Sequence, residues 1–349
     1  MIDELRELLL IPGVSGFEEK VREHIEGKAQ WYARTETDRM GNLYASLGGE
    51  ERSIMVMAHM DENGMVVSRI EENGFVRFRV IGGIDDRCLV GRVVNLVTRQ
   101  GPVKGVIGLL PPHLMVRPEQ EMSKVLRTED LRIDLGCSSA EEVKGLGVDL
   151  TTPVLFEKQP VMLQNNLFSA RGLDNRMGCA VLLEVLRRLH GKRLNSKVTF
   201  VWSVQEEIGL RGATVVAMQH RPDYAIIIDT CSATDIPGVP DHFSELRVGG
   251  GPVIRYIDNR AIATPAFVAY VREVAAAHDI PYQIGISGGS TDGAAAQSSG
   301  ACMVPLGVAI RYTHAPVECI SLDDLDDLVR LLETLILEMD QGGMDAKKV

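Results

Sequence analysis

The sequence predicts an α/β protein, a three-layer αβα sandwich with a mostly parallel central sheet, into which a smaller β-rich domain is inserted. Long strands and amphipathic helices alternate after residue 170, as in parallel sheets joined by crossover helices. Between residues 65 and 157 the chain instead has short β-like runs separated by Gly, Pro and Asn-Gly turns. At 349 residues it also exceeds the size at which one hydrophobic core usually stops growing. We therefore expect a main domain of residues 1–64 and 158–349 and an insert of residues 65–157.

The N-terminal segment carries signals for two helices and two strands. After a Pro-Gly helix breaker, Ser15 and Glu18 match the Ser-x-x-Glu capping box that begins many helices. The run from Ile54 to Ala58 is apolar throughout, which is typical of a central strand covered by helices on both faces. The predicted elements are helices at 3–10 and 15–32 and strands at 43–47 and 53–59.

The rest of the chain supplies the alternating elements of the sandwich. Helical periodicity separates runs of β-branched and aliphatic residues, as expected for crossover connections. Helices are predicted at 138–146 within the insert and at 175–189, 210–220, 265–278 and 322–339 beyond it, with strands at 197–204, 224–229 and 303–308.

The excess of acidic residues limits the kinds of partner that the protein can bind. There are 48 acidic and 37 basic residues, which gives a formal net charge of -11. Because nucleic acids and anionic membranes require a concentrated basic face, we expect neither as a partner. The N-terminus is acidic ahead of a short apolar run, unlike a signal peptide, and no stretch approaches the roughly 18 apolar residues of a membrane helix. We therefore expect the protein in the cytoplasm.

Histidines and carboxylates collect where the predicted buried strands end. In open α/β sheets, binding sites lie beyond the carboxyl ends of the strands. One further carboxylate, Asp174, opens the first helix after the insert. The residues concerned are His59, Asp61, Asp174, Glu206, Glu207, Asp229 and His314.

Each of these residues has a simpler explanation when it is taken alone. A single histidine at a strand end is usually a satisfied polar group, and Asp174 could cap its helix. The pair Glu206-Glu207 could be solvated, and Asp229 could form a turn. Their coincidence at one sheet edge, however, is electrostatically costly unless cations lie among them. Two imidazoles with carboxylates and no thiolate suit zinc or cobalt better than calcium, and one bridging carboxylate would make a two-metal site.

The chain resembles the glutamyl-aminopeptidase family of clan MH, tetrahedral self-compartmentalising metallopeptidases of which some carry cellulase names. The segments that carry the likeness follow the family's order over essentially the whole chain, namely AHMDENG, GLDNR, QEEIGLRG, IIIDT, GGSTDG and YTHAPVE. The resemblance implies a zinc-exopeptidase-like catalytic domain and a PDZ-like β-barrel insert that mediates assembly into dimers and a tetrahedral dodecamer. It also implies a metal-dependent aminopeptidase that removes N-terminal residues from short peptides.

The same resemblance implies a ligand set for two divalent ions, zinc or cobalt. Asp174 would bridge the two ions. His59 and Asp229 would complete one site, and Glu207 and His314 would complete the other.

Two further carboxylates would act without holding a metal. Asp61 would orient His59 and raise its basicity, as carboxylates behind metal-binding histidines do. Glu206 would be the general base that takes a proton from the metal-bridging water and passes it to the leaving amine.

Two positions depart from the family's usual residues. Asn63 stands where an apolar residue such as Ile is usual, and Asn175 stands where a second Asp follows the bridge. Neither is a ligand in the implied scheme. We expect these positions to alter pocket polarity and fine positioning, and Asn63 is the first candidate for setting substrate preference.

Three other functions are compatible with parts of the sequence. The segment GISGG matches the G-x-S-x-G elbow of serine hydrolases, with Ser287 as nucleophile and His314 downstream, although the nearest acid, Asp292, is only five residues on. The cellulase names suggest a glycosidase in which Glu206 pairs with a distant carboxylate, but this leaves both histidines unexplained, and two tryptophans offer little sugar stacking. A non-catalytic assembly protein that has kept the fold would bind no metal and cleave no peptide.

Overall fold

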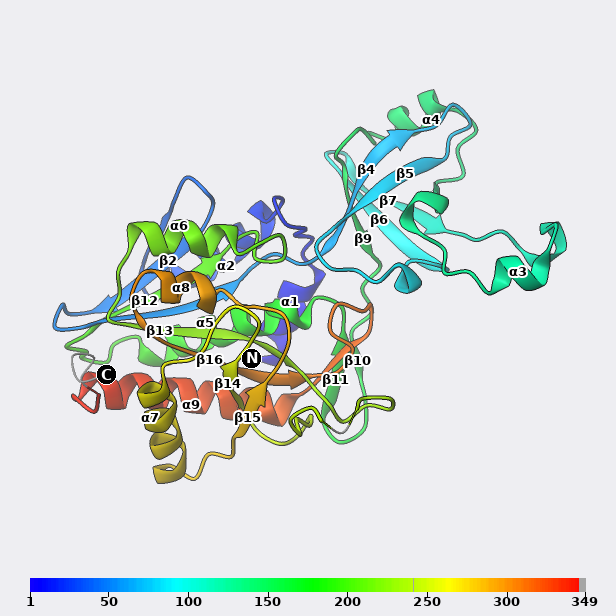
Figure 1. The fold of residues 1–349 in the computed structure, drawn as a ribbon. Coiled ribbons are helices and arrows are strands. Elements are labelled where there is room, and N and C mark those ends of the chain that lie inside the picture. Colours follow the sequence, from blue (N-terminus) through cyan, green and yellow to red (C-terminus); the bar gives the residue numbers. More distant parts are fainter. Residues whose placement is uncertain (241, 345–349) are drawn as a thin grey trace.

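The protein consists of a large α/β part and a β-barrel that projects from one end of it (Figure 1). The computed structural model describes residues 1–240 and 242–344. None of the helices in these residues is long and apolar enough to cross a membrane.

The α/β part is built on an eight-stranded sheet whose centre is parallel. In spatial order its strands are β1 (Arg34–Thr37), β2 (Leu43–Gly48), β12 (Lys197–Ser203), β3 (Ser53–His59), β13 (Tyr224–Ser232), β16 (Cys302–Ile310), β14 (Val253–Ile257) and β15 (Gln283–Ile286). The four strands from β12 to β16 run parallel to one another. Antiparallel pairs occur only towards the two edges among the described strands of this sheet, at β1–β2, β2–β12 and β14–β16. The predicted fold class is confirmed.

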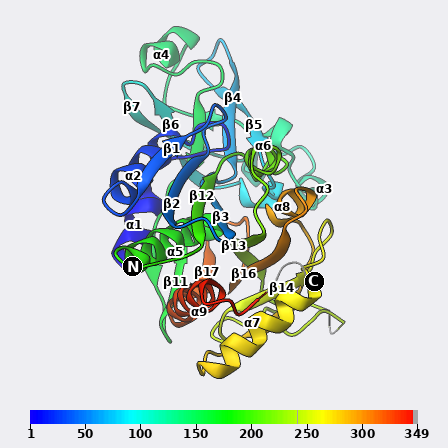
Figure 2. The same cartoon turned by 90° about the vertical axis from the view of Figure 1, so that its left-hand side faces the viewer.

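Helices cover both faces of this sheet (Figure 2). One face packs against α1 (Ile2–Leu10), α2 (Glu19–Ala29), α5 (Leu173–Leu189), α7 (Pro265–Ala277) and α9 (Leu322–Asp340), and the other against α6 (Arg211–Gln219) and α8 (Gly293–Ser298). The two layers enclose separate apolar cores on either side of the sheet.

Strand β3 is buried on both faces because its side chains alternate between these cores. Ile54, Val56 and Ala58 belong to the core under the larger helix layer. Met55 and Met57 belong to the core under α6 and α8. Burial stabilises the fold by roughly 25 cal/mol for each Å² of apolar surface removed from water. The continuous apolar run in the sequence therefore reflects a strand that is covered on both sides.

The insert is a closed barrel of six antiparallel strands. Around the barrel these are β4 (Gly64–Ile70), β5 (Val76–Ile81), β8 (Ile133–Asp134), β7 (Gly101–Ile107), β6 (Arg92–Thr98) and β9 (Pro153–Phe156). Its core is its own, with Val67, Val94, Ile133 and Val154 buried together. A short helix, α4 (Ala140–Gly145), adds Val143 to this core. Closure leaves the barrel without exposed strand edges.

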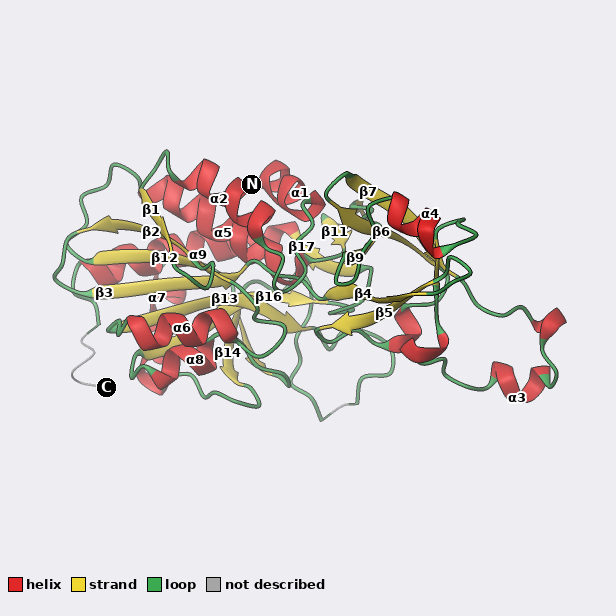
Figure 3. Cartoon of the chain, turned by 90° about the horizontal axis from the view of Figure 1, so that it is seen from above, coloured by secondary structure: helices red, strands yellow, loops and turns green. Residues whose placement is uncertain are grey.

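A long arm leaves the barrel between β7 and β8 and contains α3 (Pro118–Met122). Figures 1 and 3 show that the arm extends away from the rest of the chain. Large apolar side chains are exposed along it, namely Leu109, Leu110, Leu114, Val116, Met122 and Val125. Uncovered apolar surface of this kind often marks an interaction site.

A small antiparallel sheet joins the end of the insert to the α/β part. It contains β10 (Val161–Met162), β11 (Leu167–Ala170) and β17 (Glu318–Ser321). Ala170, which precedes α5, pairs in register with Glu318, which follows the loop after β16. The start of α5 is therefore held beside that loop.

The second helix begins later than its capping signal predicts. Helix α2 begins at Glu19, and Ser15 lies in a turn before it. The Ser15 hydroxyl donates to Asp61 Oδ2 at 2.6 Å, and Glu18 Oε1 accepts hydrogen bonds from Gly16 N and Gln205 N. The predicted capping box at Ser15 and Glu18 is wrong, because the Ser15 hydroxyl binds the distant Asp61 and the Glu18 carboxylate binds Gly16 and the distant Gln205.

Candidate metal centre

The carboxyl ends of the parallel strands bring the predicted site residues to one edge of the sheet. His59 ends β3 and pairs in register with Ser203, the last residue of β12. Asp229 lies in β13, which pairs with β3 on the other side. Residues 206–207 follow β12, and His314 follows β16. Strand geometry thus assembles a site from segments that are distant in sequence.

The first set, which we call the inner group, consists of His59, Asp174 and Asp229. Each offers one ligand atom, and these atoms all lie within 4.8 Å of one another. His59 Nε2 is 3.4 Å from Asp174 Oδ1 and 3.8 Å from Asp229 Oδ1. The three residues are buried, and the His59 side chain is only 2% exposed.

The second set, which we call the outer group, consists of Asp174, Glu207 and His314. Their ligand atoms also lie within 4.8 Å of one another. His314 Nε2 is 3.6 Å from Asp174 Oδ2 and 3.3 Å from Glu207 Oε2. The His314 side chain is 36% exposed, so this group opens towards solvent.

Asp174 belongs to both groups because its two carboxylate oxygens face different histidines. Oδ1 faces His59, and Oδ2 faces His314. Oδ1 is buried and has no hydrogen-bond partner among the described residues. A buried anionic oxygen without a partner is costly, and a cation between the two groups would satisfy it.

The helix cap at the start of α5 is supplied by Asn175 and not by Asp174. Both residues have non-helical backbone angles and are joined by a cis peptide bond. Asn175 Oδ1 accepts the N–H of Gly178 at 3.1 Å, and its Nδ2 donates to Ile228 O at 2.7 Å. A side-chain oxygen that binds the amide three residues ahead is the usual N-cap contact. The Asp174 carboxylate is therefore left for the site.

The carboxylates of the two groups are crowded together, which raises the pKa of some of them. Burial and the charge of Asp174 raise the pKa of Asp229 to about 8, and the same two causes raise the pKa of Glu207 to about 7. Burial also opposes the charge of Asp174, but the nearby imidazoles of His314 and His59 lower its pKa. Buried carboxylates beside two imidazoles, without thiolate, form a donor set that fits two borderline divalent ions such as zinc.

Asp61 lies behind His59 and fixes both the histidine and the turn after β12. His59 Nδ1 is 3.1 Å from the Asp61 backbone oxygen and 3.4 Å from its Oδ1. The Asp61 carboxylate also accepts the backbone N–H groups of Glu206 and Glu207, at 2.9 and 3.2 Å. With Nδ1 engaged in this way, Nε2 of His59 is left to face the inner group.

Glu206 lies beside the inner group, with Oε2 3.9 Å from His59 Nε2. Its side chain is 10% exposed. Burial raises the pKa of Glu206 well above its usual value, and the charges of Asp229 and Asp292 add to this against the opposing charge of His59. A carboxyl group with a raised pKa can accept and release a proton near neutral pH.

Known proteins are similar in sequence to this chain over most of its length. A sequence profile of the M42 glutamyl aminopeptidase family matches residues 41–331. The chain belongs to this M42 family. M42 peptidases are metal-dependent, and this M42 chain is a peptide hydrolase of the aminopeptidase type.

Relatives of the M42 chain include both peptidases and a protein with a cellulase name. Lysyl aminopeptidase of Pyrococcus furiosus is 30% identical over 343 residues, which cover 96% of this chain and 96% of that protein. The TET1 peptidase of Pyrococcus horikoshii, which can assemble into a tetrahedron or a large octahedral shell, is 40% identical with a TM-score of 0.90 over 96% of this chain and 98% of its own. A Thermotoga maritima structure described as an endoglucanase is 33% identical with a TM-score of 0.79. The match covers 96% of this chain and 97% of that one. The family resemblance in the sequence is confirmed.

Two buried charged residues of this M42 peptidase support the outer group and were not predicted. Glu318 Oε1 accepts the N–H of His314 at 2.8 Å, and its Oε2 accepts the N–H of Asp174 at 3.3 Å. Arg171 donates to the side chain and the backbone of Asn63. Glu318 lies in a segment that carries the family resemblance and Arg171 directly precedes one, but Glu318 and Asp174 are 144 residues apart, and their spacing gives no sign of the contact.

The insert also reaches the candidate metal centre. The loop after β5 begins with Gly82 and Gly83, which lie against the outer group. A Cβ at Gly82, whose φ is +82°, would come within 2.5 Å of Asn63 Cβ, and a Cβ at Gly83 would lie 3.0 Å from His314 Nδ1. The missing side chains let the backbone of the insert approach the centre this closely.

Asn63 does not face an open pocket. It is 3% exposed, and its Nδ2 donates to Glu207 Oε1 at 3.1 Å. The side chain is buried beneath a candidate ligand, so any effect of Asn63 on substrate preference would act through Glu207, and that expectation stays a prediction.

The serine-hydrolase and glycosidase readings gain no support from the geometry. The Ser287 hydroxyl donates to the backbone oxygen of Gly288 at 3.2 Å, while His314 faces Asp174 and Glu207. The Asp292 carboxylate is buried and accepts the hydroxyl of Ser203. A glycosidase reading leaves both histidines without a role.

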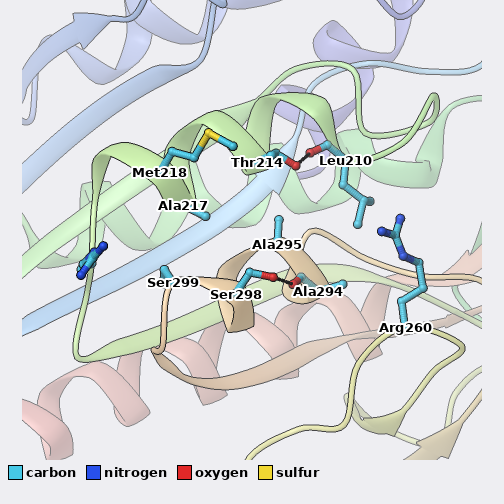
Figure 4. A pocket seen from close by; sticks show the side chains of 10 residues that line it. Leu210, Thr214, Ala217, Met218, Arg260, Ala294, Ala295, Ser298 and Ser299 are labelled. Carbon is cyan, nitrogen blue, oxygen red and sulfur yellow. Dashed lines mark hydrogen bonds between the residues drawn. The ribbon is translucent and has the colours of Figure 1, made fainter.

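A separate pocket of about 530 Å³ lies between α6 and α8 (Figure 4). Two hydroxyls on its wall are already used, because Thr214 donates to Leu210 O and Ser298 donates to Ala294 O. None of its lining residues belongs to the inner or outer group. The pocket is therefore separate from the candidate metal centre.

Proposed function

We propose that the protein is a two-cation aminopeptidase that removes residues one at a time from the N-termini of short peptides. The observation that carries the proposal is the division of Asp174 between the inner and outer groups. His59 and Asp229 would complete the ligands of one divalent ion, and Glu207 and His314 those of the other. Zinc and cobalt both suit this mixture of imidazole and carboxylate donors.

The chain's own residues would divide the work of hydrolysis. Once bound, the two cations would acidify the attacking water and polarise the scissile carbonyl. Glu206 would take the proton from that water and pass it to the leaving amine, a role that its burial and raised pKa support. Asp61 would keep Glu206 in place through the backbone N–H and would keep His59 oriented towards the inner ion.

We also propose that the insert mediates self-association into dimers and a tetrahedral dodecamer. The projecting arm supports this, because Leu114 and Val116 are 69% and 90% exposed and have no apolar cover in a single chain. Replacement of both residues with Asp should leave smaller particles in analytical ultracentrifugation while the isolated chain stays folded. Unchanged particle size would show that the arm is not in the interface.

We also propose that the protein works in the cytoplasm on short peptides. The six cysteines are free, which fits the reducing cytoplasm predicted from the sequence. The acidic net charge of -11 fits a peptide substrate better than nucleic acid. Short peptides would be the substrates of choice if assembly encloses the sites in a chamber.

One experiment tests the reaction. Purified protein is stripped with EDTA, reloaded with zinc, cobalt or manganese, and assayed on a panel of aminoacyl chromogenic substrates. We expect activity that disappears with EDTA and returns with at least one metal. Activity that is indifferent to EDTA and blocked by a fluorophosphonate would instead support Ser287. Hydrolysis of carboxymethylcellulose that is absent in Glu206→Gln would support the glycosidase.

A further inference from the structure

The two oxygens of the Glu207 carboxylate have different partners. Oε2 lies 3.3 Å from His314 Nε2 and so faces the outer group. Oε1 accepts a hydrogen bond of 3.1 Å from the side-chain amide of Asn63. One oxygen of this candidate ligand is thus engaged by the protein, and the other is left for a cation.

Arg171 fixes which end of the Asn63 amide faces Glu207. An amide can bind through its oxygen or its nitrogen, whereas a guanidinium only donates hydrogen bonds. Arg171 Nη2 donates to Asn63 Oδ1 at 2.8 Å and also to the Asn63 backbone oxygen. The Asn63 oxygen must therefore face Arg171, and its NH₂ group must face Glu207.

Arg171 is itself held firmly at the junction of the insert and the α/β part. Its side chain is 2% exposed, and its guanidinium lies 4.9 Å from the ring centre of Phe156 in β9. Its Nε lies 3.8 Å from Glu62 Oε2. The donor that reaches Glu207 is therefore positioned by a buried arginine and not by a flexible surface group.

We propose that Asn63 is a positioning residue for the outer cation. Its neutral amide turns Glu207 so that Oε1 is occupied and Oε2 alone points at the cation shared with His314 and Asp174. Because the donor carries no charge, it does not neutralise the carboxylate that faces the cation. The inference rests on the proposed cation pair and assigns Asn63 a function in metal binding instead of substrate choice.

The two hydrogen-bond partners of Asn63 can be separated by two substitutions. Asn63→Leu removes both the acceptor for Arg171 and the donor for Glu207. Asn63→Asp keeps an acceptor for Arg171 but places a carboxylate against Glu207 Oε1. If Asn63 only secures Arg171, the Asp variant should behave like the wild type. If Asn63 positions Glu207, both variants should weaken the outer cation.

The experiment measures zinc binding to the full, EDTA-stripped chain by competition with a chromogenic chelator. We expect wild type to bind two zinc ions. In both variants the weaker ion should lose about 10- to 100-fold in affinity, the loss typical of removing a group behind a metal ligand, while the tighter ion stays within a few-fold of wild type. Aminopeptidase activity that is lost at low zinc should return at high zinc.

Asn166→Asp provides a control of the same chemical kind. Asn166 Nδ2 donates to Asp323 Oδ1 at 2.7 Å on the exposed surface, so the same substitution also sets two carboxylates against each other there. Both zinc affinities should be unchanged in this variant. Circular dichroism checks that each variant is folded, and Asn63→Asp still tests the idea if Asn63→Leu does not fold.

The failures of this proposal and of the proposed function are distinguishable. If wild type binds two ions and both Asn63 variants keep both affinities, Asn63 has no positioning role and the cation pair stands. If wild type binds fewer than two ions, the cation pair itself is wrong, and the role of Asn63 falls with it. Loss of affinity in Asn63→Leu alone would assign the effect to Arg171 and would also overturn the proposal.

Discussion

The inner and outer groups of the metal centre use similar donors but are built from different parts of the fold. His59 and Asp229 lie on neighbouring parallel strands, and the His59 side chain is 2% exposed. Glu207 and His314 lie on turns beyond strand ends, and the His314 side chain is 36% exposed. The inner group is thus fixed by the sheet, whereas the outer group depends on loops and their supports. We expect the inner cation to be held more tightly and the outer one to exchange more readily.

The supports of the two groups differ in the same way. Asp61 supports the inner group from within the same short segment as His59. The outer group is supported by Asn63, Glu318 and the glycine turn of the insert, which come from distant parts of the chain. The outer group should therefore respond to changes in the insert, and the inner group should not.

The largest effect on metal binding and activity is expected from Asp174→Asn, because Asp174 is the residue that the inner and outer groups share. The variant removes one unit of negative charge from a residue that both cations would share. Both affinities should fall, and kcat/KM should fall by roughly 1,000- to 10,000-fold, since metal stabilisation of the transition state is worth several kcal/mol. Metal analysis that still finds two ions per chain would show that Asp174 is not the bridge.

Glu206→Gln should give the next largest effect without changing either group. Loss of the general base should reduce kcat by roughly 100- to 10,000-fold. The content of bound metal should match wild type, because Glu206 is not part of either ligand set. Near-normal turnover would remove Glu206 from its proposed role, and loss of metal would make it a ligand.

Asp61→Ala should act mainly on the inner group. Removal of the carboxylate behind His59 should weaken the inner cation by about 10- to 100-fold. The same carboxylate binds the backbone of residues 206–207, so kcat should also fall. Complete loss of the inner ion would indicate that Asp61 itself binds metal. An unchanged affinity would show that the backbone oxygen of Asp61 is enough to orient the histidine.

The smallest effect is expected from pH, through its influence on the affinity for the outer cation. Burial lowers the pKa of His314, but the hydrogen bond to Asp174 and the charge of Glu207 outweigh it and raise the pKa to about 10. Since Glu207 titrates at about 7, His314 alone loses a proton among the outer ligands between pH 8 and 9.5. A histidine must be deprotonated to bind a metal, so the affinity for the outer cation should rise about tenfold per pH unit there. The slope should vanish in His314→Gln, and a flat profile in wild type would contradict the assignment.

The sequence was sufficient to predict the parts of the site that depend on strands. The buried run that ends at His59 reveals a strand end directly, because a covered central strand is apolar until it leaves the sheet. The strand predicted to end at Asp229 continues to Ser232, so Asp229 lies inside β13. The family segments added the residues on the turns. The predicted ligands lie together in the structure for these reasons.

The parts that could not be predicted all depend on contacts between distant residues. Ser15 and Glu18 match a local capping pattern, but tertiary partners compete for the same side chains and prevail. Asn175 takes the cap position that its neighbour Asp174 could have occupied. Asn63 departs from the usual apolar residue, but its contact with Glu207 joins residues 144 apart and cannot be predicted from that departure.

Stepwise removal of metal from the wild-type chain tests the central claim most directly. The fully loaded protein is titrated with a chelator while bound metal per chain and aminopeptidase activity are measured on the same samples. The asymmetry of the two groups predicts two ions that leave in separate steps, with activity lost as the first ion leaves. A maximum of one ion per chain, or two ions that leave together in a single step, would contradict a centre with a tight inner group and a looser outer group.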